Sequence, residues 1–259
     1  MSWLVFALLA YVSVQLLIGA WVSRRIRTEA DYLLAGRSLG PVMATFSTFA
    51  TWFGAETCVG AAAEAYEDGI GGVAADPFGY GVCPLAFGLF RASPLYRRGL
   101  VTLADLFRER FSSGVERTVA LLIIPSSVLW ASAQIRAFGH VLSEGTGLDE
   151  NVGIALAALV AGVYTVFGGL LADAYNDLIQ GSVLIVCLLI LLFVVVSDTG
   201  GPAATFQVLS RAPRVHTVSR SLLPTMNDWA VPVLGSLFAQ ELLSRVAGAR
   251  SERVARRGT

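Results

Sequence analysis

Long apolar runs, separated by short polar segments, make up most of this chain. Four runs contain no charged residue and approach the roughly 20 residues that a transmembrane α-helix needs; they lie at 3–22, 118–135, 151–172 and 178–197. Three more runs are interrupted by acidic side chains and lie at 40–66, 69–90 and 229–243. The pattern therefore predicts an all-α integral membrane protein with about seven transmembrane helices. We also expect a short helix at 102–113 and a tight turn at 168–173 between the fifth and sixth spans.

The distribution of arginine predicts the orientation of these spans. Cytoplasmic loops of membrane proteins carry an excess of basic residues. With the N-terminus outside, the inner segments hold the arginines of 24–37, 91–117 and 245–257, and the outer segments hold Arg211, Arg214 and Arg220. We therefore expect an N-out, C-in, multi-pass protein of the cytoplasmic (inner) membrane. The first run is interpreted as a membrane helix and not as a signal peptide, because its arginines follow the apolar run instead of preceding it.

Composition excludes several classes of protein. The 259 residues are 55% hydrophobic and only 15% charged, so neither a disordered chain nor an ordinary soluble domain fits. The formal net charge is zero and the basic residues are all arginine, which gives no support for nucleic-acid binding. Cys58, Cys83 and Cys187 all lie inside apolar runs, so they indicate neither a disulfide framework nor a zinc site.

The second run contains the first candidate site. It is rich in threonine and serine, carries Gly54 and Gly60, and places Glu56 near the middle of the membrane. An ionisable side chain in lipid costs at least about 2.5–3.5 kcal/mol at the helix centre, so such residues usually face a cavity or a partner. A locally unwound helix whose carbonyls bind an ion and an unbroken helix with small residues at a packing seam explain this composition equally well.

Asp76 in the third run has two interpretations. It stands beside Pro77, where its carboxylate could accept a hydrogen bond from a polar solute or pair with a cation. It could equally be a near-surface residue that starts a helix with proline at the first position. The run begins only seven residues earlier, at Gly69, so both interpretations stay open.

The seventh run is a second candidate for a broken helix. It contains Pro232, Gly235 and Ser236, is interrupted by Glu241, and runs in the direction opposite to the second run. Two interrupted helices of opposite orientation are the sequence signature of a midplane site in a transporter with inverted repeats. For the remaining polar residues we expect simpler roles: Arg136 reaches the interface, with a pairing to Glu56 or Asp76 as the alternative, and Asn176 and Asp177 cap the start of the sixth span.

Four stretches together resemble the sodium:solute symporter family. They are the loop from Asp31 to Gly40, the segment from Ala50 to Gly60, the segment from Tyr164 to Gln180, and the segment from Gln240 to Arg256. The resemblance implies the leucine-transporter type of fold, with two inverted five-helix repeats after one extra N-terminal helix. On that mapping the chain is a partial symporter domain: 1–23 is the extra helix, 40–197 is the first repeat, and 229–246 is the first helix of a truncated second repeat.

The resemblance also implies site residues. Ala50 and Phe53 would bind sodium through their backbone carbonyls, and Asp177 matches an acidic position near the inward path of the ion. The remaining sodium ligands of the family belong to the second repeat. The solute pocket would involve Trp52, Glu56, Thr57, Asp76, Gly235 and Ser236. No metal other than sodium and no catalytic residue is expected.

The functional expectation is sodium-coupled secondary transport of a small organic solute by alternating access, with this chain as half of the functional unit. The expected partners are the solute, Na⁺, the lipid bilayer and a second chain that supplies the missing repeat; nucleic acid is not expected. A proton in place of sodium, a membrane ligand sensor or interaction module, and an inactive truncated fragment stay open as alternatives. An enzyme is not expected, because no nucleophile–base or metal constellation occurs. The sequence does not identify the solute or the oligomeric state.

Overall fold

The computed structural model describes residues 3–54, 56–69, 73, 75–211, 226–227 and 229–259. Over these residues the chain is helical and contains no β-strand, which agrees with the predicted all-α class. The α-helices are α1 (Trp3–Ser23), α2 (Glu29–Leu34), α3 (Pro41–Trp52), α4 (Ala62–Asp68), α5 (Tyr80–Phe90), α6 (Ala92–Arg98), α7 (Leu103–Arg110), α8 (Ser113–Thr146), α9 (Glu150–Asp198), α10 (Pro202–Arg211), α12 (Gln240–Ala247) and α13 (Glu252–Arg257). Short 3₁₀ or π-helical turns are η1 (Ala35–Arg37), η2 (Glu56–Ala61), η4 (Ala75–Gly79), η5 (Val231–Gly235) and η6 (Ser236–Phe238).

Helices α1, α8 and α9 are long and apolar enough to cross a membrane, judged by length and composition within the described ranges. Helix α8 begins where the Ser112 hydroxyl accepts a hydrogen bond from the Val115 N–H, and it ends before Gly147, whose φ is 73°. Helix α9 begins at a comparable cap, because the Asp149 carboxylate accepts from the N–H groups of Asn151 and Val152. Such caps satisfy backbone donors that have no partner inside the helix.

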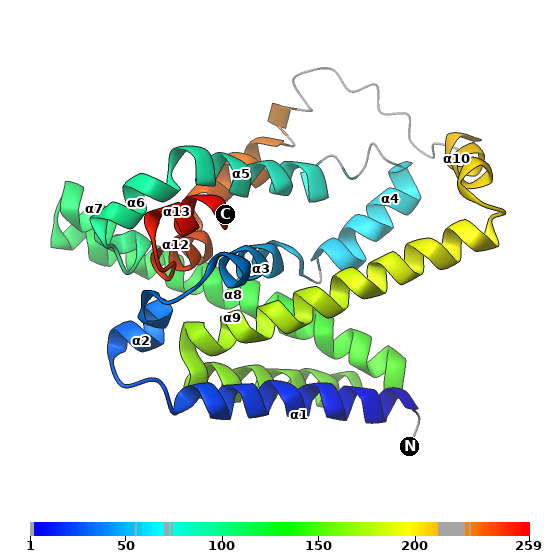
Figure 1. Ribbon diagram of the computed structural model, residues 1–259, viewed down its shortest axis with the longest axis horizontal. Coiled ribbons are helices and arrows are strands. Elements are labelled where there is room, and N and C mark those ends of the chain that lie inside the picture. The colour runs from blue at the N-terminus through cyan, green and yellow to red at the C-terminus, as the bar shows by residue number, and fades with distance from the viewer. Residues whose placement is uncertain (1–2, 55, 70–72, 74, 212–225, 228) are drawn as a thin grey trace.

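Helix α9 is bent sharply at Gly169, which divides it into a short arm (150–168) and a long arm (170–198) (Figure 1). Gly169 has φ 51° and ψ −156°, a conformation that side chains with a Cβ rarely adopt. A Cβ there would lie 2.5 Å from the Tyr32 carbonyl oxygen, and the Tyr32 hydroxyl donates to the Thr165 carbonyl at 3.0 Å. The bend coincides with the turn predicted at 168–173, so the predicted fifth and sixth spans are the two arms of α9.

The interrupted runs correspond to segmented helices. The second run is divided into α3, η2 and α4, the third into η4 and α5, and the seventh into η5, η6 and α12. The predicted helix at 102–113 is α7, which begins with a capping box between Thr102 and Asp105. The number of membrane crossings and their orientation stay predictions, as do the repeat boundaries.

The hydrophobic core lies where α3, α5, α6, α12 and α13 meet, on the left of Figure 1. Phe87, Leu242 and Val246 are buried there. The Leu39 N–H donates to the Gly248 carbonyl at 3.1 Å, and the Arg250 N–H donates to the Leu39 carbonyl at 3.0 Å. These bonds hold the segment after α12 against the loop that enters α3, and so they fix α12 relative to α3.

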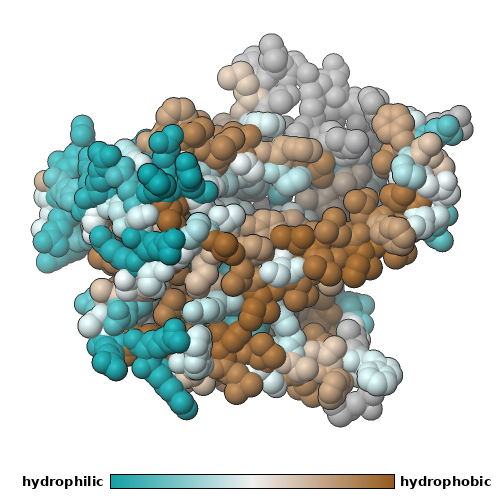
Figure 2. Space-filling view, viewed as in Figure 1, coloured by the Kyte–Doolittle hydropathy of each residue, from teal (hydrophilic) through white to brown (hydrophobic). Residues whose placement is uncertain are grey.

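Outside this core, large apolar side chains cover much of the surface. Figure 2 shows a hydrophobic band over the long arm of α9 and a hydrophilic end over α6 and α7. On that arm Leu189 is 60% exposed and Phe193 is 71% exposed. Contiguous exposed apolar surface of this kind marks contact with a membrane or with other protein.

Candidate functional site

The second predicted span is broken. Helix α3 ends at Trp52, Phe53 has the non-helical angles φ −102° and ψ 80°, and helical structure resumes at Glu56 as a π-helical turn. Across the break, the Thr57 hydroxyl donates to the Trp52 carbonyl at 3.3 Å and the Cys58 N–H donates to the Gly54 carbonyl at 3.1 Å. Of the two interpretations that the composition left open, the structure has the unwound helix.

The seventh predicted span is broken as well. Ala239 has φ −69° and ψ 131°, an extended conformation between η6 and α12. The Gln240 side chain accepts a hydrogen bond from the Leu103 N–H at 2.6 Å, so the new helix starts against the start of α7. The sequence identified this span as a broken helix, and the extended residue follows Gly235 and Ser236 by a few positions.

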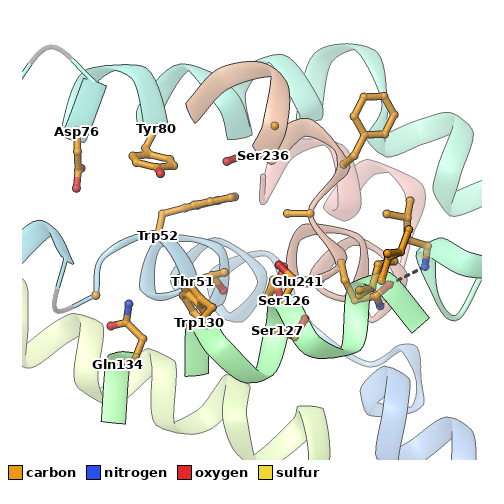
Figure 3. A pocket seen from close by; sticks show the side chains of 18 residues that line it. Thr51, Trp52, Asp76, Tyr80, Ser126, Ser127, Trp130, Gln134, Ser236 and Glu241 are labelled. Atoms are coloured by element: carbon orange, nitrogen blue, oxygen red, sulfur yellow. Dashed lines mark hydrogen bonds between the residues drawn. The ribbon is translucent and has the colours of Figure 1, made fainter. Parts of the chain in front are cut away.

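Both breaks border one cavity of about 480 Å³ (Figure 3). This volume falls in the range of roughly 300–1,000 Å³ that is typical of small-molecule pockets. Its lining side chains include four aromatic residues, two carboxylates, several hydroxyls and two amides, and among the residues that the structure describes neither arginine nor histidine lines it. The polar and aromatic members are Thr51, Trp52, Asp76, Tyr80, Ser126, Ser127, Trp130, Gln134, Ser236, Gln240 and Glu241, together with Phe238.

Trp52 and Tyr80 are stacked, with ring centroids 5.7 Å apart and an interplanar angle of 26°. Asp76 comes directly before Pro77 in η4, and its carboxylate accepts a hydrogen bond from the Thr57 hydroxyl at 2.8 Å. The Asp76 residue is only 9% exposed, and its backbone is extended (φ −125°, ψ 122°) directly before Pro77, so a role at the start of the helix and a role in the cavity both stay open. The bond from Thr57 links the break in the second span to the start of the helix in the third.

A second, smaller cavity of about 300 Å³ lies beside the first, and Trp52, Asp76 and Tyr80 line both. Phe53 and Thr57 line this smaller cavity, together with residues of α3 and the segment 257–259. The space around Trp52 and Asp76 therefore extends to both sides of the stacked rings.

An ion-pair cluster lies close to the two cavities, but its charged residues line neither of them. Nη2 of Arg245 is 2.5 Å from Oδ2 of Asp173 and 3.3 Å from Oδ2 of Asp177. Nε of Arg245 donates to the Thr51 hydroxyl at 3.2 Å, and the Ser47 hydroxyl donates to Asp177 at 2.5 Å. The cluster thus joins α3, the long arm of α9 and α12.

The expectation that Asp177 caps a helix is wrong. Asp177 and Asn176 lie inside the long arm of α9, past the bend at Gly169, and both are buried. A capping residue must precede its helix, whereas the Asp177 carboxylate contacts Ser47 and Arg245 on other helices.

The structure brings some of the predicted site residues together and not others. Trp52, Asp76, Gly235 and Ser236 line the larger cavity, and Thr57 contacts Asp76. Ala50 and Asp177 line neither cavity, and the Glu56 side chain lies outside what the structure describes. The sodium-binding and solute-binding roles of these residues stay predictions. Arg136 is exposed, and its expected position at the interface stays a prediction.

Sequence reasoning missed several lining residues. Trp130 and Gln134 are four positions apart and so share one face of α8, where two polar or amphipathic residues in an apolar span were the available signal. Tyr80 gave no signal. Glu241 was noticed as an interruption of its run but received no role, and the pairing of Arg245 with Asp173 has no local signature.

Sequence comparison with known proteins identifies a family of transporters. The family model of the sodium:solute symporter family matches residues 32–259. The high-affinity choline transporter 1 of Drosophila melanogaster is 34% identical over 64% of this chain and 27% of its own length. The osmoregulated proline transporter OpuE of Bacillus subtilis is 27% identical over 78% of this chain and 43% of its own length. The sodium/pantothenate symporter of Escherichia coli is 27% identical over 79% of this chain and 44% of its own length.

The chain therefore spans less than half the length of these curated relatives. The relatives are transporters and not enzymes. The match to the family model extends from residue 32, within α2, to the last residue of the chain. This 259-residue chain belongs to the sodium:solute symporter family.

Proposed function

We propose that this chain contributes to sodium-coupled transport of a small organic cation of the quaternary-ammonium class by alternating access across the cytoplasmic membrane. The observation that carries the solute class is the lining of the larger cavity. Four aromatic side chains and two carboxylates border it, and within the described part of the chain no arginine or histidine is among its lining residues.

Aromatic faces attract cations through the ring quadrupole, and the attraction increases when the cation is desolvated. Trp52, Tyr80 and Trp130 line the cavity, where their rings would contact a trimethylammonium group that has left water. Asp76 supplies a compensating carboxylate beside the stacked pair. Choline transporters among the relatives of this chain support the same solute class.

The break that follows α3 supports the sodium role proposed for Ala50 and Phe53. Transporters with inverted repeats coordinate coupling ions through backbone carbonyls of unwound helices near the bilayer midplane. Ligands from a second repeat, outside these 259 residues or in a second chain, would complete that site. Asp177 would lie along the inward path of the ion, where Ser47 already orients its carboxylate.

Coupling would follow from a difference in affinity between conformations. Sodium at the break would favour the outward-open state, and the solute would then favour closure. The cluster of Arg245, Asp173 and Asp177 ties both broken helices to α9, and it would have to separate for release into the cytoplasm.

Uptake of radiolabelled choline into sealed membrane vesicles that contain the chain tests the proposal. We expect accumulation driven by an inward sodium gradient and abolished by Asp76→Asn, with Asp198→Asn at the exposed end of α9 as the matched control. Accumulation that is independent of sodium would overturn sodium coupling in favour of protons. Binding without accumulation would overturn transport in favour of a membrane sensor.

A further inference from the structure

Glu241 and Asp76 both line the larger cavity, but they lie in different parts of its wall. In Figure 3 the two carboxylates lie on opposite sides of Trp52, with Asp76 beside Tyr80 and Glu241 on the side of Ser126 and Ser127. The cavity therefore has a carboxylate toward each end and aromatic rings between them.

The position of Glu241 is fixed by its own short helix. At the start of α12, Gln240 accepts a hydrogen bond from the Leu103 N–H at 2.6 Å. The two residues that follow Glu241, Leu242 and Leu243, are buried, and Arg245 forms the ion pair with Asp173. With anchors on both sides, the Glu241 side chain is held toward the cavity.

Glu241 does not use the cation that is nearest along its helix. Residues four apart on a helix are neighbours, and a glutamate four residues before an arginine commonly pairs with it. Here Arg245 pairs with Asp173 and Asp177, and Glu241 has no ion pair or hydrogen bond among the residues described by the structure. Its carboxylate stays available to the contents of the cavity.

The guanidinium of Arg245 is shared between the carboxylates of Asp173 and Asp177, and it forms no ion pair with Glu241 among the described residues. A carboxylate with this environment favours a positively charged or hydrogen-bond-donating ligand group and repels another carboxylate.

We propose that Glu241, with the hydroxyls of Ser126 and Ser127, forms a second subsite that selects the far end of the solute. This inference rests on the proposed function, in which the rings and Asp76 hold the ammonium group. The second subsite accepts a hydroxyl or a second ammonium group, as in amino alcohols and diamines. It rejects zwitterions whose far end is a carboxylate.

Choline and glycine betaine make a matched pair of probes, because both carry a trimethylammonium group and they differ in a hydroxymethyl or a carboxylate end. Binding of radiolabelled choline to the purified full chain, with competition by betaine, gives their ratio of affinities. We expect the wild-type chain to prefer choline by about tenfold or more, equivalent to about 1.4 kcal/mol. Glu241→Gln should weaken choline severalfold, strengthen betaine, and reduce the preference to about threefold or less.

Glu241→Asp keeps the charge and should keep most of the preference, which guards against a general loss of structure. Glu144→Gln, at an exposed position of α8 outside the cavity lining, should change neither affinity. An unchanged ratio in Glu241→Gln, with choline still bound and Asp76→Asn still weakening it, overturns the second subsite alone. No choline binding by the wild-type chain overturns the proposed function and this inference with it.

Discussion

Arg245 and Asp173 form an ion pair of 2.5 Å between the helix that follows the second break and the long arm of α9. The two residues are separated by much of the chain, so the pair closes a long loop. Their side chains are 11% and 33% exposed, and the same guanidinium also reaches Asp177. Because this cation serves two carboxylates in a largely buried position, its loss leaves negative charge without compensation.

Arg245→Ala should therefore destabilise the chain strongly. Removing one partner of a buried ion pair commonly costs about 3–5 kcal/mol. Thermal unfolding in detergent measures the effect, and Arg98→Ala provides a control at the exposed pair with Glu109, where we expect less than about 1 kcal/mol. Equal, small changes for both variants would contradict a structural role for the buried cluster.

The bend in α9 should depend on glycine at position 169. Gly169→Ala places a Cβ 2.5 Å from the Tyr32 carbonyl and requires a positive φ at a residue with a side chain. We expect a loss of at least about 1–3 kcal/mol from the backbone conformation, and more from the clash. Gly162→Ala, in a helical position with open space around it, should be neutral or slightly stabilising. If both variants unfold at the temperature of the parent, the bend does not need glycine.

The start of α2 should be sensitive to acid through Asp31, whose side chain forms a capping box with Thr28. This carboxylate accepts hydrogen bonds from the Arg27 N–H at 3.1 Å and the Thr28 N–H at 3.0 Å, and these bonds hold the pKa of Asp31 below its ordinary value. A lowered pKa in the folded state gives stability above the unfolded pKa of about 4 and loses it as the pH falls through the folded pKa. Asp31→Asn should thus lower the melting temperature near neutral pH, and its difference from the parent should shrink below about pH 4. A difference that stays constant over this range would show that the capping box is unimportant.

Cation binding at the break that follows α3 should depend on the size of residue 54. A Cβ on Gly54 would lie 2.9 Å from the Gln134 side-chain oxygen, at the end of a flexible side chain. Gly54→Ala should therefore displace Gln134 from the cavity wall and weaken cation binding severalfold with little loss of stability. Gly60→Ala has open space around the added methyl group and serves as the control, measured by the same choline-binding assay. Equal affinities in the two variants would show that Gln134 does not shape the site.

The long helices, the two broken spans and part of the cavity lining can be predicted from local sequence. Charge-free apolar runs identify α1, α8 and the two arms of α9, because helices in lipid must be long and apolar. Small and polar residues near Gly54 and Gly235 mark the two spans that break. Asp76 stands out beside Pro77 in an apolar run, and the resemblance to symporters adds Trp52; both residues line the cavity.

Other features depend on contacts between distant residues and have no local signal. Asp177 looks like a helix cap in the sequence, yet it is buried against Ser47 and Arg245 on other helices. Trp130 lies on α8 in an apolar span, and only the packing of α8 against the broken helices decides which of its faces borders the cavity. Periodicity identifies a helix but does not choose its partner.

The central claim is that the cavity at the broken helices binds an organic cation. Equilibrium binding of radiolabelled choline to the purified chain tests it most directly, with Asp76→Asn, Trp52→Ala and the control Asp198→Asn measured beside the parent. The account predicts saturable binding by the parent and the control, and a loss of about tenfold or more in each cavity variant, in line with removing a carboxylate or a cation–π face from a desolvated site. No saturable binding by the parent, or equal binding by all four proteins, would contradict it.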